Sequence, residues 1–235
     1  MNFEKIGIVV ADGDEYKALR SRVETGNYQE LEILKREAHK FEIYTENGAV
    51  EVISILCGIG KVNAAAATVC LISMGCDVIL NYGLSGGVSN IKRGEISLPN
   101  RFLEHDFDLT MISYAPCEKP AQPTYIYNAD EKLLNIAKGV ITSAKVGTAV
   151  SGDRFICDDN VREALANQFG AMSCDMETAA IAYVCSYSDV PFLAVRRVSD
   201  DAGNDAKDAY TDMNISDETV LYDYIEQIIK AISND

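Results

Sequence analysis

Short apolar runs alternate with helical patterns along this chain, and that order limits the possible folds more than any other feature. The β-branched run at residues 6–10 predicts a buried strand, and the apolar positions after it, through Leu19 and Val23, predict a helix. The GIGK sequence at 58–61 precedes an alanine-rich helix expected at 62–74, and a buried strand expected at 78–81 ends in a glycine turn at 83–87. Strand, turn, helix and strand in this order are typical of an α/β fold.

Other segments extend this pattern over the whole chain. Alternating residues predict antiparallel strands at 31–35, 41–45 and 49–56, so part of the sheet should be mixed. Further helices are expected at 128–140, 161–169, 176–187 and 220–232, further strands at 146–150 and 192–198, and an excursion around 99–127. The chain has 235 residues, 48% of them hydrophobic, without a repeat or linker, and is predicted to form a single domain over residues 1–235.

The balance of charge argues against polyanionic partners. Lys and Arg total 21 against 36 Asp and Glu, which gives a formal net charge of −15. Such a surface repels phosphate backbones and anionic lipid, so we expect neither nucleic acid nor a membrane as a partner. A small neutral or cationic ligand fits this charge better.

Two further absences in the sequence concern location and metals. The chain lacks the run of about 20 apolar residues that crosses a bilayer, and its start resembles a strand more than a secretory segment, so a cytoplasmic location is expected. Only His39 and His105 could supply imidazole, so no histidine-based metal site is predicted.

Polar or glycine-rich segments follow four of the expected strands, at 12–15, 83–87, 151–155 and 199–201. In open α/β sheets ligands collect beyond the carboxyl ends of the strands, so these segments are the first candidates for a site. Their carboxylates, without a set of metal ligands, suggest general acid/base chemistry. The alternative is structural: acidic residues after strands cap helices, and glycines permit positive φ.

Two other segments carry the same ambiguity. The GIGK sequence lacks the spacing of a phosphate-binding Walker loop, and close packing of a helix on a strand is its expected role. Glu177 enters an alanine-rich helix beside a core-facing stripe, where a charge is costly unless it binds something. Stabilisation by the helix dipole is the alternative for Glu177.

Several motifs together resemble one family, the 5′-methylthioadenosine/S-adenosylhomocysteine nucleosidases of the purine nucleoside phosphorylase superfamily. The resemblance covers nearly the whole chain, and its most specific parts are SGDRFI at 151–156, Met176-Glu177 and Ser199-Asp200. It implies a three-layer α/β/α sandwich around a mixed, partly barrel-like sheet. It also implies a homodimer without a cofactor or metal, which hydrolyses the N-glycosidic bond of a 5′-substituted adenosine, as in methionine salvage.

The resemblance also implies roles for individual residues. Asp200, steadied by Ser199, would act as general acid on N7 of the purine. Glu15 would deprotonate the attacking water, and Glu177 would hold the ribose hydroxyls and stabilise the positive charge that develops on the sugar.

Four further positions are assigned to substrate contacts by the same resemblance. Phe155 would stack on the base, and the backbone of Ile156 would read its edge. Met176 would pack beneath the sugar, and Tyr210 would close the 5′ end together with the neighbouring subunit.

The sequence departs from the family at Leu84, Arg154 and Arg197, and Asp12-Gly13-Asp14 replaces a more glutamate-rich approach to Glu15. Leu84 stands where the family usually has a serine, and either Ser85 replaces that hydroxyl or the substrate differs. Arg154 and Arg197 occupy positions of smaller residues, and either arginine is surface-exposed or marks a different 5′ group or an anion.

Two rival functions remain open at this point. A phosphate-dependent purine nucleoside phosphorylase is the first, although the chain has Asn81-Tyr82 where an arginine would precede the glycine turn. A non-catalytic nucleoside-binding protein is the second, because a fold alone never fixes a function.

Overall fold

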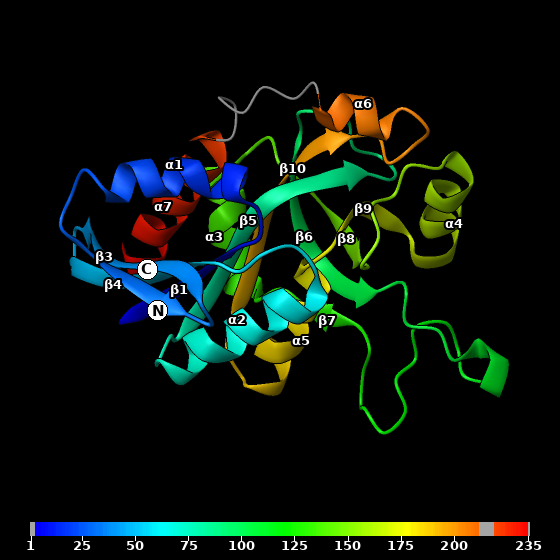
Figure 1. Cartoon of the computed structure of the whole chain (residues 1–235), viewed down its shortest axis with the longest axis horizontal. Helices are drawn as coiled ribbons and strands as arrows, with labels where there is room; N and C mark the ends of the chain where they lie inside the picture. Colours follow the sequence, from blue (N-terminus) through cyan, green and yellow to red (C-terminus); the bar gives the residue numbers. More distant parts are fainter. Residues whose placement is uncertain (1–2, 212–218, 235) are drawn as a thin grey trace.

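The computed structural model describes residues 3–211 and 219–234, and one mixed sheet runs through them (Figure 1). Its strands, in chain order, are β1 (Lys5–Val10), β2 (Tyr28–Ile33), β3 (Arg36–Thr45), β4 (Gly48–Leu56), β5 (Val78–Gly87), β6 (Ile96–Glu104), β7 (Tyr127–Asn128), β8 (Lys145–Ser151), β9 (Ala171–Asp175) and β10 (Phe192–Asp200). In space they follow the order β10-β6-β8-β9-β5-β1-β4-β3-β2, with β7 beside β6.

One half of the sheet closes on itself. β10 pairs in parallel with β5 and antiparallel with β6, so β5, β10, β6, β8 and β9 form a ring. The other half, β1, β4, β3 and β2, continues from β5 as an open sheet. The partly barrel-like mixed sheet expected from the sequence is therefore confirmed.

Helices cover both faces of this sheet, as the three-layer α/β/α prediction requires (Figure 1). On one face lie α1 (Gly13–Val23), α3 (Glu131–Val140) and α7 (Thr219–Asn234), and on the other lie α2 (Lys61–Ser73) and α5 (Thr178–Tyr187). The short η1 (Thr110–Ile112), α4 (Asp159–Phe169) and α6 (Ala206–Thr211) complete the described helices. None of the helices within the described residues combines the length and the apolar character needed to span a membrane.

The layers are held by apolar stripes at helical spacing. In α7 the buried positions recur every three or four residues, at Leu221, Tyr222, Ile225, Ile228, Ile229 and Ile232. They pack into one cluster with Ile6, Val52 and Leu80 of the sheet. At about 1.5–3 kcal/mol for each large buried side chain, this face contributes substantially to the stability of the fold.

The structure corrects several boundaries of the predicted elements. Residues 83–87 were expected to form a turn, but β5 continues through them because they pair with β10 and β9. The excursion expected at 99–127 overlaps β6, and β9 was not predicted at all. The strand expected at 31–35 is shifted to Tyr28–Ile33, because Leu34 and Lys35 adopt positive φ in the following turn.

Candidate active site

A cavity of about 570 Å³ lies where the carboxyl ends of β1, β5, β9 and β10 meet. Most of the site residues predicted from the sequence line it, namely Glu15, Ser85, Phe155, Met176, Glu177, Ser199, Asp200 and Tyr210. Ile156 is buried next to Phe155 in the chain and is not among the lining residues. Residues distant in sequence are therefore brought to one pocket, as ligand binding at strand ends predicts.

Glu15 serves both the helix and the cavity. Asp12 caps α1, and Glu15 completes a capping box by accepting the Asp12 backbone N–H at 3.3 Å. Its other oxygen accepts the Leu84 backbone N–H at 2.7 Å. Burial raises the pKa of Glu15 from 4.5 to about 8, although the Arg196 guanidinium and the Leu84 N–H oppose this rise. The capping alternative and the functional prediction are thus compatible.

This raised pKa makes the stability of the protein depend on pH. Between pH 4.5 and about 8 the folded protein holds a proton on Glu15 that the unfolded chain has released, so the free energy of unfolding falls as the pH rises. Glu15→Gln removes the titrating group. We therefore expect the free energy of unfolding of the variant to fall by about 2–4 kcal/mol less than that of the wild type between these pH limits. Denaturant unfolding at both limits measures the difference. Equal losses in the two proteins would contradict the assigned protonation.

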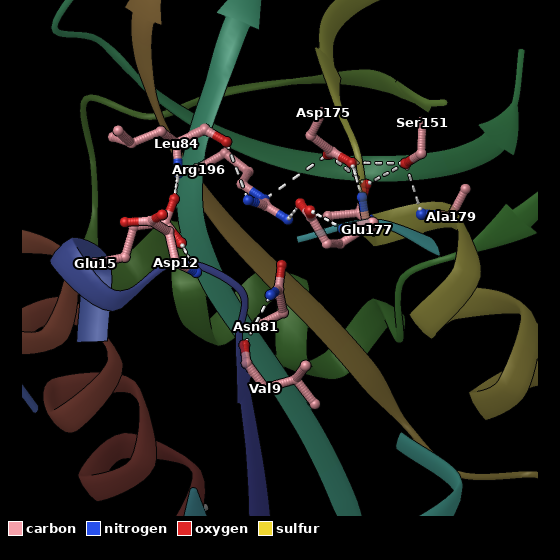
Figure 2. A network of polar contacts seen from close by, with 12 residues as sticks. Val9, Asp12, Glu15, Asn81, Leu84, Ser151, Asp175, Glu177, Ala179 and Arg196 are labelled. Atoms are coloured by element: carbon pink, nitrogen blue, oxygen red, sulfur yellow. Dashed lines mark hydrogen bonds and ion pairs between the residues drawn. The ribbon is translucent and has the colours of Figure 1, made fainter. Parts of the chain in front are cut away.

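Arg196 is the main site residue that sequence reasoning missed. Its side chain is buried in β10 between Glu15 and Glu177 (Figure 2). The guanidinium donates from Nη1 to the Leu84 carbonyl oxygen at 3.0 Å and from Nη2 to Glu177 at 3.4 Å. An arginine inside an otherwise apolar strand needs buried acidic partners, and this was the available signal.

The two arginines singled out from the sequence lie elsewhere. Arg154 is exposed, and Arg197 is half-buried on the strand position next to Arg196. Neither lines the cavity. Successive residues of a strand point to opposite faces, so of the pair in β10 it is Arg196 that reaches the site.

Glu177 receives hydrogen bonds from two separate segments. Besides Arg196, the Gly60 backbone N–H donates to its Oε1 at 3.0 Å. Burial raises the pKa of Glu177, while the positive charge of Arg196 works in the opposite direction. The packing role predicted for the GIGK sequence is therefore incomplete, because this segment also positions a carboxylate of the cavity.

Asp175 anchors the backbone that carries Glu177 (Figure 2). Its Oδ1 accepts the backbone N–H groups of Glu177 and Thr178, both at 2.9 Å, and the Ser151 hydroxyl at 2.6 Å. Its Oδ2 lies 3.8 Å from Nε of Arg196. The sequence drew attention to Glu177 over Asp175. Both acids line the cavity, but the hydrogen bonds of Asp175 to the Glu177 and Thr178 backbone also hold the start of α5.

Asp200 is the last residue of β10 and also lines the cavity. The Ser199 hydroxyl donates to its Oδ2 at 2.7 Å, and the Ala202 backbone N–H donates to its Oδ1 at 2.8 Å. Burial raises the pKa of Asp200, and both hydrogen bonds moderate that rise. A carboxyl group in this environment favours the protonated form more than one in water does.

Two aromatic rings and two consecutive residues of β5, Leu84 and Ser85, complete the lining of the cavity. Phe155 and Tyr210 meet edge to face with ring centroids 5.6 Å apart. Leu84 holds Glu15 and Arg196 through its backbone, and its side chain lines the cavity. Ser85 is buried, and its carbonyl oxygen lies 3.2 Å from the hydroxyl oxygen of Ser199.

Comparison with known proteins gives a consistent set of relatives. The family model of the phosphorylase superfamily matches residues 5–232. The chain is 32% identical to the 5′-methylthioadenosine/S-adenosylhomocysteine nucleosidase of Tolumonas auensis, with 88% of this chain and 90% of that protein covered. It is 36% identical to the protein of the same name from Staphylococcus carnosus, with 86% and 88% covered.

Solved structures also resemble this chain. The S-adenosylhomocysteine nucleosidase from Streptococcus pyogenes, in complex with 5-methylthiotubericidin, superposes with a TM-score of 0.89 at 26% identity over 98% of each chain. The futalosine hydrolase of Helicobacter pylori also gives a TM-score of 0.89, at 24% identity over 96% of this chain and 97% of that one. At that identity the second likeness concerns the fold alone.

Proposed function

Because the chain belongs to the 5′-methylthioadenosine/S-adenosylhomocysteine nucleosidase family of the phosphorylase superfamily, we propose that it hydrolyses the N-glycosidic bond of 5′-substituted adenosines. The observation that carries this proposal is one cavity lined by Asp200, whose pKa is raised by burial, and by Glu15 and Glu177, which lie close to the buried Arg196. Adenine and a free sugar are the products.

In this mechanism Asp200 is the general acid. Its protonated carboxyl group donates to N7 of the purine, so the base leaves as a neutral species. The raised pKa of Asp200 supports this role, and the hydrogen bonds from Ser199 and Ala202 fix the orientation of the carboxyl group.

Glu15 and Glu177 act on the water and the sugar. Glu15 takes a proton from the attacking water, and a pKa near 8 places it close to the range in which a general base works best. Glu177 holds the ribose hydroxyls, and its negative charge stabilises the oxocarbenium-like transition state. Arg196 donates to Glu177 and to the carbonyl oxygen of Leu84, whose N–H donates to Glu15. These contacts hold Glu15 and Glu177 in place.

The remaining residues hold the substrate. Phe155 stacks on the base, the backbone of Ile156 reads its edge, and Met176 packs beneath the sugar. Tyr210 closes the 5′ end, which is consistent with its ring contact to Phe155 at the cavity wall. Ser85, which lines the cavity, supplies the hydroxyl that Leu84 lacks and contacts the water or the sugar.

The proposal includes a homodimer that works in the cytoplasm in methionine salvage. The segment between β6 and β7 extends away from the body of the molecule (Figure 1). Its side chains of Met111 and Ile112 are 95% and 64% exposed, which is unusual for apolar residues of this size. Burial against a second subunit would remove this surface from water, and light scattering of the purified protein tests the stoichiometry.

Gly83 lies close to the side chains of Arg196 and Glu15, so a larger residue at this position is expected to disturb the site. A Cβ atom at this position would lie 2.5 Å from Nη1 of Arg196 and 2.8 Å from Oε1 of Glu15. Gly83→Ala must therefore displace both side chains, and we expect kcat/KM to fall about 100-fold. Gly139→Ala, in α3, is the matched control, because the added methyl group meets nothing within 4 Å. Similar activity of both variants would refute this placement.

The substrate class is tested by a panel of nucleosides in phosphate-free buffer. Methylthioadenosine, S-adenosylhomocysteine, adenosine and inosine are incubated with the protein, and free base is quantified by chromatography. The proposal requires rapid release of adenine from the two thioether nucleosides. No release from any member of the panel would contradict the proposal. If adding phosphate also produced no release, a nucleoside-binding protein would be favoured over a phosphorylase.

A further inference from the structure

The cavity wall carries two oppositely charged residues that the proposed mechanism does not use. Asp12 and Lys207 both line the cavity, Asp12 half-buried and Lys207 exposed. Asp12 stands at the end of β1, beside Glu15, and Lys207 belongs to the six-residue α6. Among the described residues, neither forms an ion pair with the other or with any third side chain.

Their position along the cavity follows from Tyr210. Lys207 precedes Tyr210 by three residues in α6, so the two side chains share one face of the helix. Thr211, the next residue, also lines the cavity. Lys207 therefore lines the cavity beside Tyr210, the residue proposed to close the 5′ end of the substrate.

Asp12 approaches the same region from the other wall. Its Oδ1 accepts the Asp14 backbone N–H at 2.8 Å, which fixes the carboxylate at the start of α1. Its backbone N–H donates to Glu15, the proposed base for the water that attacks the sugar. A group that extends from the sugar past Glu15 toward Tyr210 meets the negative charge of Asp12 and the positive charge of Lys207.

Building on the proposed function, we infer that Asp12 and Lys207 are specificity-determining residues that favour 5′ thioether groups carrying an amino-acid head over uncharged ones. Lys207 binds the carboxylate of that head, and Asp12 binds its ammonium group. S-Adenosylhomocysteine has both charges, and methylthioadenosine has neither.

The charges of Asp12 and Lys207 favour a zwitterionic group for two reasons. The chain carries a formal net charge of −15, so its overall field opposes the approach of a carboxylate. A lysine at the cavity mouth offsets that field locally. Opposite charges placed for both ends of a zwitterion also fix its orientation, and they give no advantage to an alkyl group of the same length.

Four adenosine thioethers separate charge from length. S-Adenosylhomocysteine carries both charges, the 3-carboxypropyl thioether only the carboxylate, the 3-aminopropyl thioether only the ammonium group, and the butyl thioether none. The values of kcat/KM for the first three are each divided by the value for the butyl compound. This ratio cancels any effect of a substitution on the chemical step.

Lys207→Gln should lower the ratios for the two carboxylate-bearing compounds by about threefold to fivefold, and Lys207→Glu by about tenfold. Asp12→Asn should lower the ratios for the two ammonium-bearing compounds by about threefold to fivefold, and asparagine preserves the cap of α1. Lys132→Gln and Lys132→Glu, at an exposed position of α3 outside the cavity, are the matched controls and should leave every ratio unchanged.

Unchanged ratios in the Lys207 variants overturn the role of Lys207, and unchanged ratios in Asp12→Asn overturn that of Asp12. A ratio that falls equally for all three compounds shows an effect of shape and overturns recognition by charge. Failure of the proposed function is a different result, because wild-type protein would then release adenine from none of the four compounds.

Discussion

Asp200→Asn is expected to lower kcat by about 10²–10⁴-fold, with little change in KM. An amide cannot donate the proton that N7 of the leaving purine requires. It still accepts the Ala202 N–H, so the end of β10 should keep its shape. Steady-state release of adenine, followed with saturating methylthioadenosine, measures the loss.

The neighbouring Asp201 provides the matched control. It is exposed and lies outside the cavity lining, so Asp201→Asn makes the same chemical change and leaves the carboxyl group of Asp200 in place, removing only a minor cause of the raised pKa of Asp200. Its kcat should stay close to that of the wild type. If Asp200→Asn also turned over at the wild-type rate, Asp200 would not be the general acid.

Glu15→Gln is expected to cause a loss of similar size, about 10²–10⁴-fold in kcat, because a glutamine amide cannot take a proton from water. Glutamine still offers one oxygen to the Leu84 backbone N–H. Binding of substrate should therefore survive, and calorimetric titration of the variant with S-adenosylhomocysteine tests this directly.

Asp14→Asn is the control for this substitution. Asp14 lies in the first turn of the same helix but is exposed and outside the cavity lining. Loss of activity in Asp14→Asn as large as in Glu15→Gln would point to damage of α1 and away from activation of water. Full activity of Glu15→Gln would remove Glu15 from the mechanism.

Local patterns were sufficient for most of the fold. Composition and periodicity alone predict three of its elements: the β-branched run of β1, the alanine-rich α2 and the apolar stripe of α7. The five residues of β9, AMSCD, show neither alternation nor a β-branched run. Their conformation depends on pairing with β8 and β5, which no local pattern reveals.

The site was predictable where a motif names a residue and unpredictable where function depends on contacts between strands. Glu15, Glu177 and Asp200 follow predicted strands or open helices, and they reach the cavity as expected. Arg196 escaped notice because its three acidic partners come from α1, the end of β9 and the start of α5, and Glu15 in α1 is remote in sequence. Gly83 was assigned to a turn, although its lack of a side chain makes room for that cluster.

The identity of the sugar product in phosphate buffer tests the central claim most directly. Purified protein is incubated with methylthioadenosine at a saturating concentration of phosphate, and the sugar is identified by mass spectrometry. Attack by water predicts free methylthioribose at a rate that does not depend on phosphate. Methylthioribose 1-phosphate, formed only when phosphate is present, would contradict the account and identify a phosphorylase.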